Sequence, residues 1–327
     1  PDVCGLHELC VRPGRGLHHQ DQDGPQHERA APVRDPGARG LIVFPKTRAF
    51  VKKAMPSKLL KNKPMSTTPS HVALLTNGSI YYVIVAFGTG SDLWIYTLTD
   101  KLVDFDKLTL FDNTNVYITQ LLVCQQQLYV VTRSDQLDMC VHAYNIKTHK
   151  INLKYCISNY DDPDGAYFIG PTTNDFYYSN FRQVMHVDFK THIARDVYHV
   201  KAPLKVISIM KTSSKLFVGV TYGNRMHKMQ KNGQLHTIDN SRHQQCRVTH
   251  IHEIVKMMPY YYNDMFVALY ANASERLHFY DANMNEPLQF FTQEQKTTER
   301  SISGVYDMCT APNGYVAVLK LDSTAHA

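Results

Sequence analysis

The chain has 327 residues, which is too long for one small domain and long enough for one large all-β domain or two ordinary ones. Apolar residues make up 43% of the sequence and charged residues 20%, so the composition supports a packed core and excludes wholesale disorder. The longest unbroken apolar run, residues 80–87, is too short to span a membrane.

The formal net charge of +6 comes from one short stretch. Residues 64–327 contain 23 basic and 23 acidic residues, so the body of the protein is neutral. This balance argues against a global nucleic-acid-binding surface. Residues 41–63 contain seven basic residues and no acid, and we interpret them as a solvated linker rather than a nuclear-import or phosphate-binding segment.

Residues 1–40 differ in composition from the rest. They contain no aromatic residue, although the whole chain has 35. Gly, Pro, Arg, His, Ala, Asp and Gln dominate the segment, and such a composition buries too little apolar surface to fold. We therefore predict a disordered or non-native tail over 1–40. Because the chain begins with Pro1, we also expect it to be a fragment.

The seven cysteines are odd in number and include no CxxC pair. This pattern argues against a disulfide framework and against a tetrahedral zinc site. Cys124, Cys140 and Cys309 lie in or beside apolar runs, and we predict that they are small core residues. A reducing compartment follows from that interpretation, so the expected location is cytoplasmic or nuclear.

An aromatic-led apolar run recurs along the body at intervals of 48, 48, 40, 49 and 49 residues. The markers are Tyr81, Tyr129, Tyr177, Phe217, Phe266 and Tyr315. A turn such as Asn77-Gly78 precedes each marker, and another apolar run precedes that turn. A polar loop, a third apolar run and a less regular fourth run follow. The repeating unit is therefore four short strands in about 45 residues.

Four-stranded units of this length, repeated radially, are the blades of a β-propeller. We predict an all-β propeller over 41–322 with six four-stranded blades, five or seven being the alternatives, and a short tail over 323–327. The last unit has only two strands of its own. Strands at 40–44 and 48–53 are expected to complete it, so that the N- and C-terminal strands share a blade.

The repeat resembles the β-propeller superfamily of loose WD40-like and quinoprotein-like repeats, without features of one subfamily. Trp94 is the single tryptophan and is not followed by Asp, unlike a WD40 blade end, and no Gly-Gly pair of the kelch type occurs. The Thr148-His149-Lys150 and Thr191-His192 turns resemble the Thr-Gly-Lys turns of quinoprotein-like propellers. The resemblance implies no cofactor.

Catalytic motifs are absent from the sequence: it has no Gly-x-Ser-x-Gly, P-loop or dinucleotide fingerprint. The densest acidic cluster is Asp161-Asp162-Pro163-Asp164-Gly165, which has the oxygen ligands that calcium prefers. We interpret it as an ordinary Asp-Pro and Asp-Gly turn instead. No metal and no cofactor are therefore expected.

Long polar connections are expected between blades, at 156–165, 239–249 and 292–301, and they define one long-loop face of the ring. That face offers charges of both signs, which suit a polar protein partner. Tyrosines 260–262 either pack between blades or contact a partner. The candidate partner-binding residues are Arg133, Asp162, Arg182, Arg242, Arg247, Tyr260 and Tyr261.

We therefore predict a monomeric, non-catalytic scaffold that binds a protein or peptide partner and neither membrane nor, through its body, nucleic acid. Two alternatives remain open. One is a propeller enzyme of the calcium-assisted hydrolase type that uses the acidic cluster at 161–164. The other is the substrate-recognition domain of a larger multidomain protein, such as a ubiquitin ligase.

Overall fold

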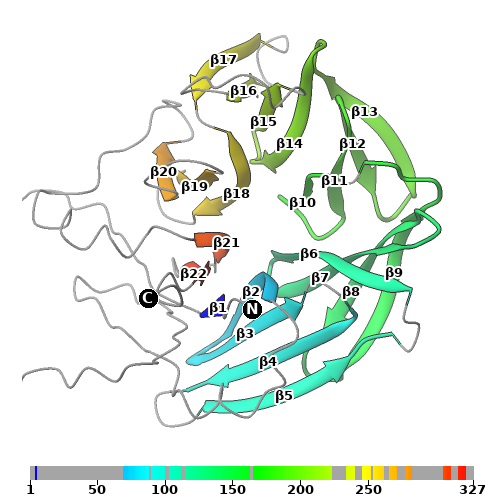
Figure 1. Ribbon diagram of the computed structural model, residues 1–327, viewed down its shortest axis with the longest axis vertical. Coiled ribbons are helices and arrows are strands. Elements are labelled where there is room, and N and C mark those ends of the chain that lie inside the picture. Colours follow the sequence, from blue (N-terminus) through cyan, green and yellow to red (C-terminus); the bar gives the residue numbers. More distant parts are fainter. Residues whose placement is uncertain are drawn as a thin grey trace, which may run out of the picture.

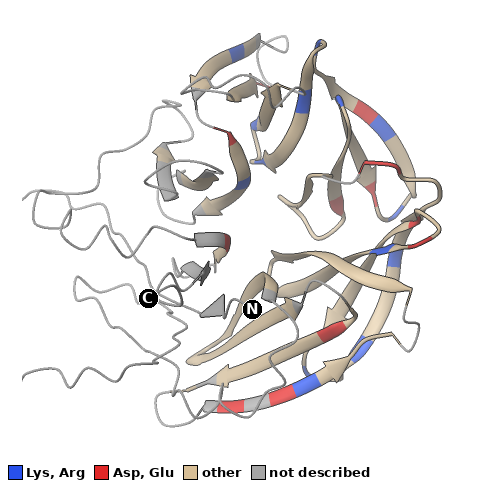
Figure 2. Cartoon of the chain, in the orientation of Figure 1, with Lys and Arg blue, Asp and Glu red and all other residues tan. Residues whose placement is uncertain are grey.

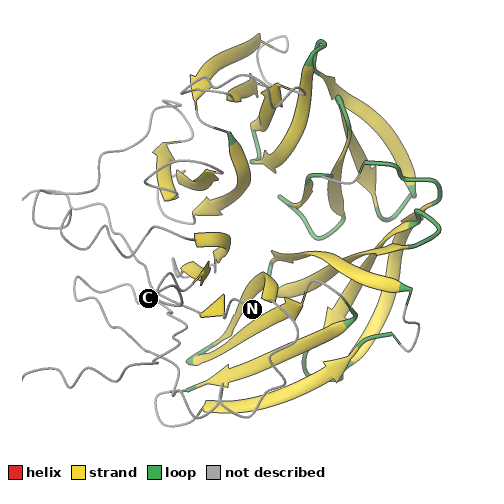
Figure 3. Ribbon diagram, in the orientation of Figure 1, coloured by secondary structure: helices red, strands yellow, loops and turns green. Residues whose placement is uncertain are grey.

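The computed structural model describes residues 4–5, 69–87, 90–99, 103–111, 115–162, 165–222, 233–239, 245–251, 253–260, 265–270, 277–281, 305–310 and 316–321. Within these ranges the chain forms strands, turns and loops and contains no helix (Figure 3). It follows that no helix in the described ranges has the length and apolarity needed to cross a bilayer.

Four sheets have four antiparallel strands each, taken in chain order. The first contains β2 (Pro69–Asn77), β3 (Ile80–Phe87), β4 (Asp92–Leu98) and β5 (Val103–Thr109). The second contains β6 (Val116–Cys124), β7 (Gln127–Ser134), β8 (Met139–Asn145) and β9 (Lys150–Ile157). The third contains β10 (Tyr167–Ile169), β11 (Asp175–Asn180), β12 (Gln183–Asp188) and β13 (Ile193–His199). The fourth contains β14 (Leu204–Lys211), β15 (Lys215–Tyr222), β16 (Gly233–Asp239) and β17 (Gln245–Ile251).

Two further sheets have three described strands each. One contains β18 (Ile254–Tyr260), β19 (Met265–Tyr270) and β20 (Leu277–Asp281). The other contains β21 (Val305–Thr310), β22 (Val316–Leu321) and the two-residue β1 (Cys4–Gly5), which pairs with β22. N- and C-terminal strands thus share a sheet, but the N-terminal strand is β1. The predicted closing strands at 40–44 and 48–53 lie outside the described residues.

The sheets are arranged in a ring (Figure 1). Contacts join the first strands in sequence, from β2 to β6, β10, β14, β18 and β21, and β21 contacts β2 to close the circle. The chain is therefore an all-β propeller, as the aromatic spacing predicts. The predicted count of six four-stranded blades is not confirmed, because four sheets have four strands and two have three.

Five of the aromatic markers lie in the second strands β3, β7, β11, β15 and β19, whose central residues are buried, whereas Tyr315 lies outside the described residues. In β7, Leu128 and Val130 pack into a core shared with the β2–β5 sheet, whereas Tyr129 and Val131 pack into a core shared with the β10–β13 sheet. Since successive side chains point to opposite faces, a strand between two blades needs an apolar residue at every position. Phe217 and Phe266 occupy the equivalent strands and are also buried.

Fourth strands form the polar rim of the ring. Every residue of β13 except Tyr198 is exposed, and β5 carries acidic and basic residues in alternation with apolar ones (Figure 2). A charged outer edge opposes pairing with another chain, because bringing a second strand against it would juxtapose and desolvate those charges.

A β-bulge recurs in the first strands. It lies immediately before a polar residue in β2, β6, β14, β18 and β21. These polar residues are His71, Gln120, Ser208, Lys256 and Asp307. A bulge inserts one extra residue and re-aims the side chains beside it.

Four of these five residues approach one another across the ring, whereas Ser208 donates to the Ile254 carbonyl at 2.8 Å. The His71 imidazole Nδ1 lies 3.9 Å from the Asp307 carboxylate. Asp307 accepts a hydrogen bond from the Val72 backbone N–H at 2.7 Å and pairs with Lys256 at 2.7 Å. With its amide oxygen facing Lys256, Gln120 accepts a further hydrogen bond at 3.0 Å. First strands of four sheets therefore meet in one buried polar network, which we call the axial network: His71, Gln120, Lys256 and Asp307.

Cys140 corrects the cysteine prediction. It forms a disulfide with Cys156, which lies directly opposite on β9 with its Cα 4.1 Å away. A one-residue register shift between Val141 and His142 brings Cys156 to this position. Cys124 and Cys309 are free and buried, as the apolar runs around them predict.

The loop assignment of one predicted segment is also wrong. Residues 239–249 were expected to join two blades, but β16 and β17 pair with each other within one sheet. The short segment between these strands is therefore a connection within a blade.

Candidate functional site

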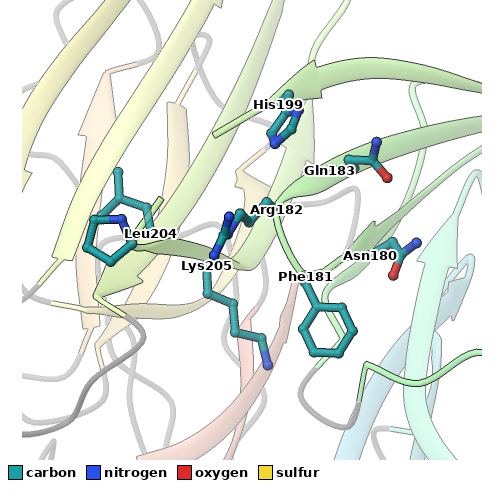
Figure 4. A pocket seen from close by; sticks show the side chains of 8 residues that line it. Asn180, Phe181, Arg182, Gln183, His199, Leu204 and Lys205 are labelled. Atoms are coloured by element: carbon teal, nitrogen blue, oxygen red, sulfur yellow. The ribbon is translucent and has the colours of Figure 1, made fainter. Parts of the chain in front are cut away.

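A cleft of about 490 Å³ opens on the long-loop face of the β10–β13 sheet (Figure 4). One wall is the β11–β12 turn, and the other is the connection from β13 to β14. We call it the Arg182 cleft; its lining is Asn180, Phe181, Arg182, Gln183, His199, Pro203, Leu204 and Lys205. The volume falls in the range of ligand-binding pockets.

Backbone hydrogen bonds fix the two walls to each other. Val200 N–H donates to the Arg182 carbonyl at 2.9 Å, and Val206 N–H donates to the Phe181 carbonyl at 2.8 Å. Phe181 has a φ of 51°, a left-handed conformation that bulky residues rarely adopt. Such strain persists only where the surroundings over-determine the backbone, and it gathers at functional sites.

The buried Asp162 carboxylate holds residues of the cleft lining in place. One oxygen lies 2.9 Å from the Lys205 ammonium. The other accepts hydrogen bonds from the Ser179 hydroxyl at 3.0 Å and from the Phe181 backbone N–H at 2.9 Å. Asp162 therefore positions two residues of the cleft lining, and it does so from the connection that enters the β10–β13 sheet.

Arg133 holds that same connection in place from β7. Its guanidinium donates to the Tyr160 carbonyl at 2.9 Å and to the Asp162 carbonyl at 3.1 Å, and it lies 5.4 Å from the centre of the Tyr160 ring. The planar guanidinium spans two carbonyl groups at once, which a lysine ammonium does less well.

Tyr160 and Gly165 complete the support. The Tyr160 hydroxyl donates to the Ser179 carbonyl at 2.7 Å, and burial raises the pKa of this phenol above its usual range. A side chain at Gly165 would collide with the Tyr160 hydroxyl, so only glycine fits without a shift. Side chains on both sides of the connection thus hold Tyr160, Asp162 and Gly165 in place.

The structure brings together three of the seven predicted site residues. Arg182 lines the cleft and is exposed, whereas Arg133 and Asp162 are 6% and 0% exposed and support it from within. The expectation that both lie on the surface is wrong. The Arg133 guanidinium is bonded to the Tyr160 and Asp162 carbonyls, and the Asp162 carboxylate is bonded to Lys205, Ser179 and Phe181. Their direct contact with a partner remains only a prediction.

The other four predicted residues are not part of the cleft as described. Arg247 is exposed on β17, and Tyr260 ends β18. Arg242 and Tyr261 lie outside the described residues.

Sequence reasoning missed Phe181, His199 and Lys205. Phe181 has a local signal: an aromatic residue occupies a tight turn after Asn180, where Gly, Asn or Asp is usual. Lys205 has no such signal, because its partner Asp162 lies in a different connection.

The lining of the cleft consists of basic, amide and apolar side chains. The eight lining residues include no hydroxyl, thiol or carboxylate side chain, so they supply no nucleophile of the serine, cysteine or aspartate type. In the part of the chain that the structure describes, no group of three metal-ligating side chains occurs. Both oxygens of Asp162 have protein partners, which opposes the calcium alternative at this residue.

Comparison with known proteins does not assign a family. No family model and no curated protein matches this chain. A chain of the Nidogen/Laminin complex is similar over 71% of this chain and 82% of its own, with 6% identity and a TM-score of 0.48. An oligogalacturonate lyase in complex with manganese is similar over 80% of this chain and 79% of its own, with 8% identity and a TM-score of 0.48. A chain of the Mitotic Checkpoint Complex is similar over 84% of this chain and 99% of its own, with 9% identity and a TM-score of 0.46.

Proposed function

We propose that this propeller is a non-catalytic scaffold that binds a protein or peptide partner through its long-loop face, with the Arg182 cleft as the contact point. One observation carries the proposal: a preorganised cleft lies on that face and is lined by groups that bind rather than react. Rigid scaffolds commonly carry recognition residues on such connections. The two three-stranded sheets are, in this proposal, the fifth and sixth blades.

Charge and apolar surface support a protein partner. Phe181 is 41% exposed beside Arg182, so an aromatic ring and a guanidinium are presented together. Aromatic residues and arginine dominate the energetics of protein interfaces. On the neighbouring β7–β8 turn, Leu137 is likewise 40% exposed and left-handed, with a φ of 63°, and it offers a second apolar side chain to a partner.

A site-specific crosslinking experiment tests the proposal. A photoreactive amino acid is placed at Gln183 in the cleft or, as a control, at Lys190 in the β12–β13 turn on the opposite edge. We expect the Gln183 probe to capture a defined partner in cells and the Lys190 probe not to. An Arg182→Ala change should abolish that capture. Equal capture from both positions, or capture insensitive to Arg182→Ala, would place the partner surface elsewhere.

A further inference from the structure

The Arg182 cleft has a cationic lining. Arg182 and Lys205 carry positive charge and His199 lies beside them, while no carboxylate is among the eight lining residues. Within the part of the chain that the structure describes, no side chain bonds to the Arg182 guanidinium. This side chain is therefore available to a ligand, and a guanidinium binds a carboxylate through two parallel hydrogen bonds.

Lys205 behaves differently from Arg182. Its charge is balanced by the buried Asp162 at 2.9 Å, and its ammonium lies 5.4 Å from the centre of the Phe181 ring. Figure 4 shows the Lys205 and Phe181 side chains extending side by side. Lys205, which the ion pair with Asp162 holds in place, in turn contacts the Phe181 ring. The apolar surface that this ring offers to a ligand is therefore preformed.

Apolar and cationic groups are therefore adjacent. Phe181, Pro203 and Leu204 line the cleft together with Arg182. A ligand that satisfies both has an apolar side chain next to a carboxylate. A peptide provides this pair when Asp or Glu is flanked by an apolar residue.

The described residues of the long-loop face on the neighbouring β6–β9 blade include several acidic ones. Asp135 and Asp138 lie in the β7–β8 turn, and Asp161 is exposed in the connection after β9. Among the described residues, the cleft thus carries positive side chains and the neighbouring blade presents negative ones. An acidic segment is attracted to the cleft and repelled by the neighbouring blade, which confines it to one location.

We propose that the Arg182 cleft binds an acidic peptide segment, with an Asp or Glu carboxylate on Arg182 and an adjacent apolar side chain on Phe181 and Leu204. This inference rests on the proposed function and adds the chemical class of the partner. The basic residues outside the cleft are not needed for it.

Selection from a random octapeptide display library on the full chain tests the charge class directly. We expect the enriched peptides to contain Asp or Glu next to an apolar residue. Their binding to the protein, measured by fluorescence anisotropy, should weaken about tenfold when the acidic residues are replaced by Gln or Asn and should weaken further at high salt.

Variants assign the binding to the cleft. Arg182→Ala should weaken the enriched acidic peptide about tenfold. Arg195→Ala is the matched control, since Arg195 is exposed on β13 of the same sheet and does not line the cleft. Thermal unfolding should be the same for both variants, because the backbone carbonyl that Arg182 contributes to the wall is retained.

The outcomes separate this inference from the proposed function. If the enriched peptides were neutral or basic and their binding were still weakened by Phe181→Ala, the inference of an acidic ligand would be overturned. The proposed peptide-binding function would then still stand. Acidic peptides insensitive to Arg182→Ala would overturn the cleft as their site. Tighter binding of a single-stranded oligonucleotide than of any acidic peptide would replace the inference with nucleic-acid recognition. If no peptide were enriched and the Gln183 probe captured no partner, both the acidic-peptide inference and the proposed function would be overturned.

Discussion

The Asp162 carboxylate and the Lys205 ammonium lie 2.9 Å apart and join the connection after β9 to the first residues of β14. The β10–β13 sheet lies between these two points in the chain. The ion pair therefore bridges that sheet, the second carboxylate oxygen bonds to Ser179 and Phe181 within it, and the Arg182 cleft is built around Asp162.

Asp162→Ala should destabilise the protein strongly. The change leaves the Lys205 ammonium, the Ser179 hydroxyl and the Phe181 N–H without their acceptor, and breaking a buried pair from one side costs about 3 kcal/mol or more. Urea denaturation measures the loss. Asp161→Ala is the control, since Asp161 is adjacent and exposed, and it should change stability by less than about 0.5 kcal/mol. Equal effects of the two changes would contradict the assigned role of Asp162.

Arg133→Met should lower stability by about 2 kcal/mol, because it leaves the carbonyls of Tyr160 and Asp162 buried without their donor. Arg133→Lys should recover only part of the loss, since one ammonium replaces a planar fork. Thermal unfolding of the three proteins gives the order. A Lys variant as stable as the native protein would show that charge, and not the two-carbonyl geometry, matters.

The protein should lose stability as the pH falls from about 6.5 to about 4. Burial lowers the pKa of His142 to about 4, and burial likewise lowers the pKa of His71 to about 4. The unfolded chain then takes up protons near the ordinary histidine pKa, whereas the folded chain does so only near pH 4. The stabilising difference is therefore fully present above pH 6.5 and is lost on acidification.

His142→Phe isolates one of these contributions. His142 packs against Phe111 with ring centroids 4.9 Å apart, and its Nε2 lies 3.3 Å from the Thr132 hydroxyl. We expect the variant to lose about 2 kcal/mol less than the native protein between neutral pH and pH 4.5. Chemical denaturation across that pH range provides the measurement. An unchanged pH profile would exclude His142 as a source of acid sensitivity.

Lys256 and Asp307 should be energetically coupled. Lys256→Met and Asp307→Asn each unbalance a buried charge and should cost about 3 kcal/mol, while the double variant should cost less than the sum by 1 kcal/mol or more, roughly. Asn retains an acceptor for the Val72 N–H.

The exposed pair Lys107 and Asp92 is the matched control for this cycle. Its nitrogen–oxygen distance is 2.8 Å, close to the 2.7 Å of the axial pair, Lys256 and Asp307, but Lys107 is 53% exposed. The same double-mutant cycle should give a coupling of about 0.5 kcal/mol or less, because water screens the charges. Similar couplings for the two pairs would mean that burial does not strengthen the axial pair.

The ring could be predicted because its determinants are periodic. Tyr129, Phe217 and Phe266 mark second strands correctly, since a strand between two blades must be apolar on both sides. The pairing of Cys140 with Cys156 could not be predicted in this way. It depends on the register shift between Val141 and His142, and without that shift Tyr155 would lie opposite Cys140.

The sequence predicts only part of the candidate site, because the burial of its residues also depends on partners that are distant in the chain. Asp161 and Asp162 are identical in type and adjacent in sequence, yet one is exposed and the other is fully buried. Lys205, which lies far along the chain in another sheet, is one of the partners that distinguish them. Sequence spacing indicates a turn rich in carboxylates, whereas the choice of the carboxylate that faces inward requires the three-dimensional arrangement of three sheets.

The repeated bulge in β2, β6, β14, β18 and β21 has a consequence for the axis of the ring. Because alternate side chains face opposite ways along a strand, a single added residue exchanges which set points toward the middle. Five copies of one backbone irregularity thus hold five different polar side chains at a shared position. One recurring backbone feature therefore places a different polar side chain on each strand, and four of the five make up the axial network.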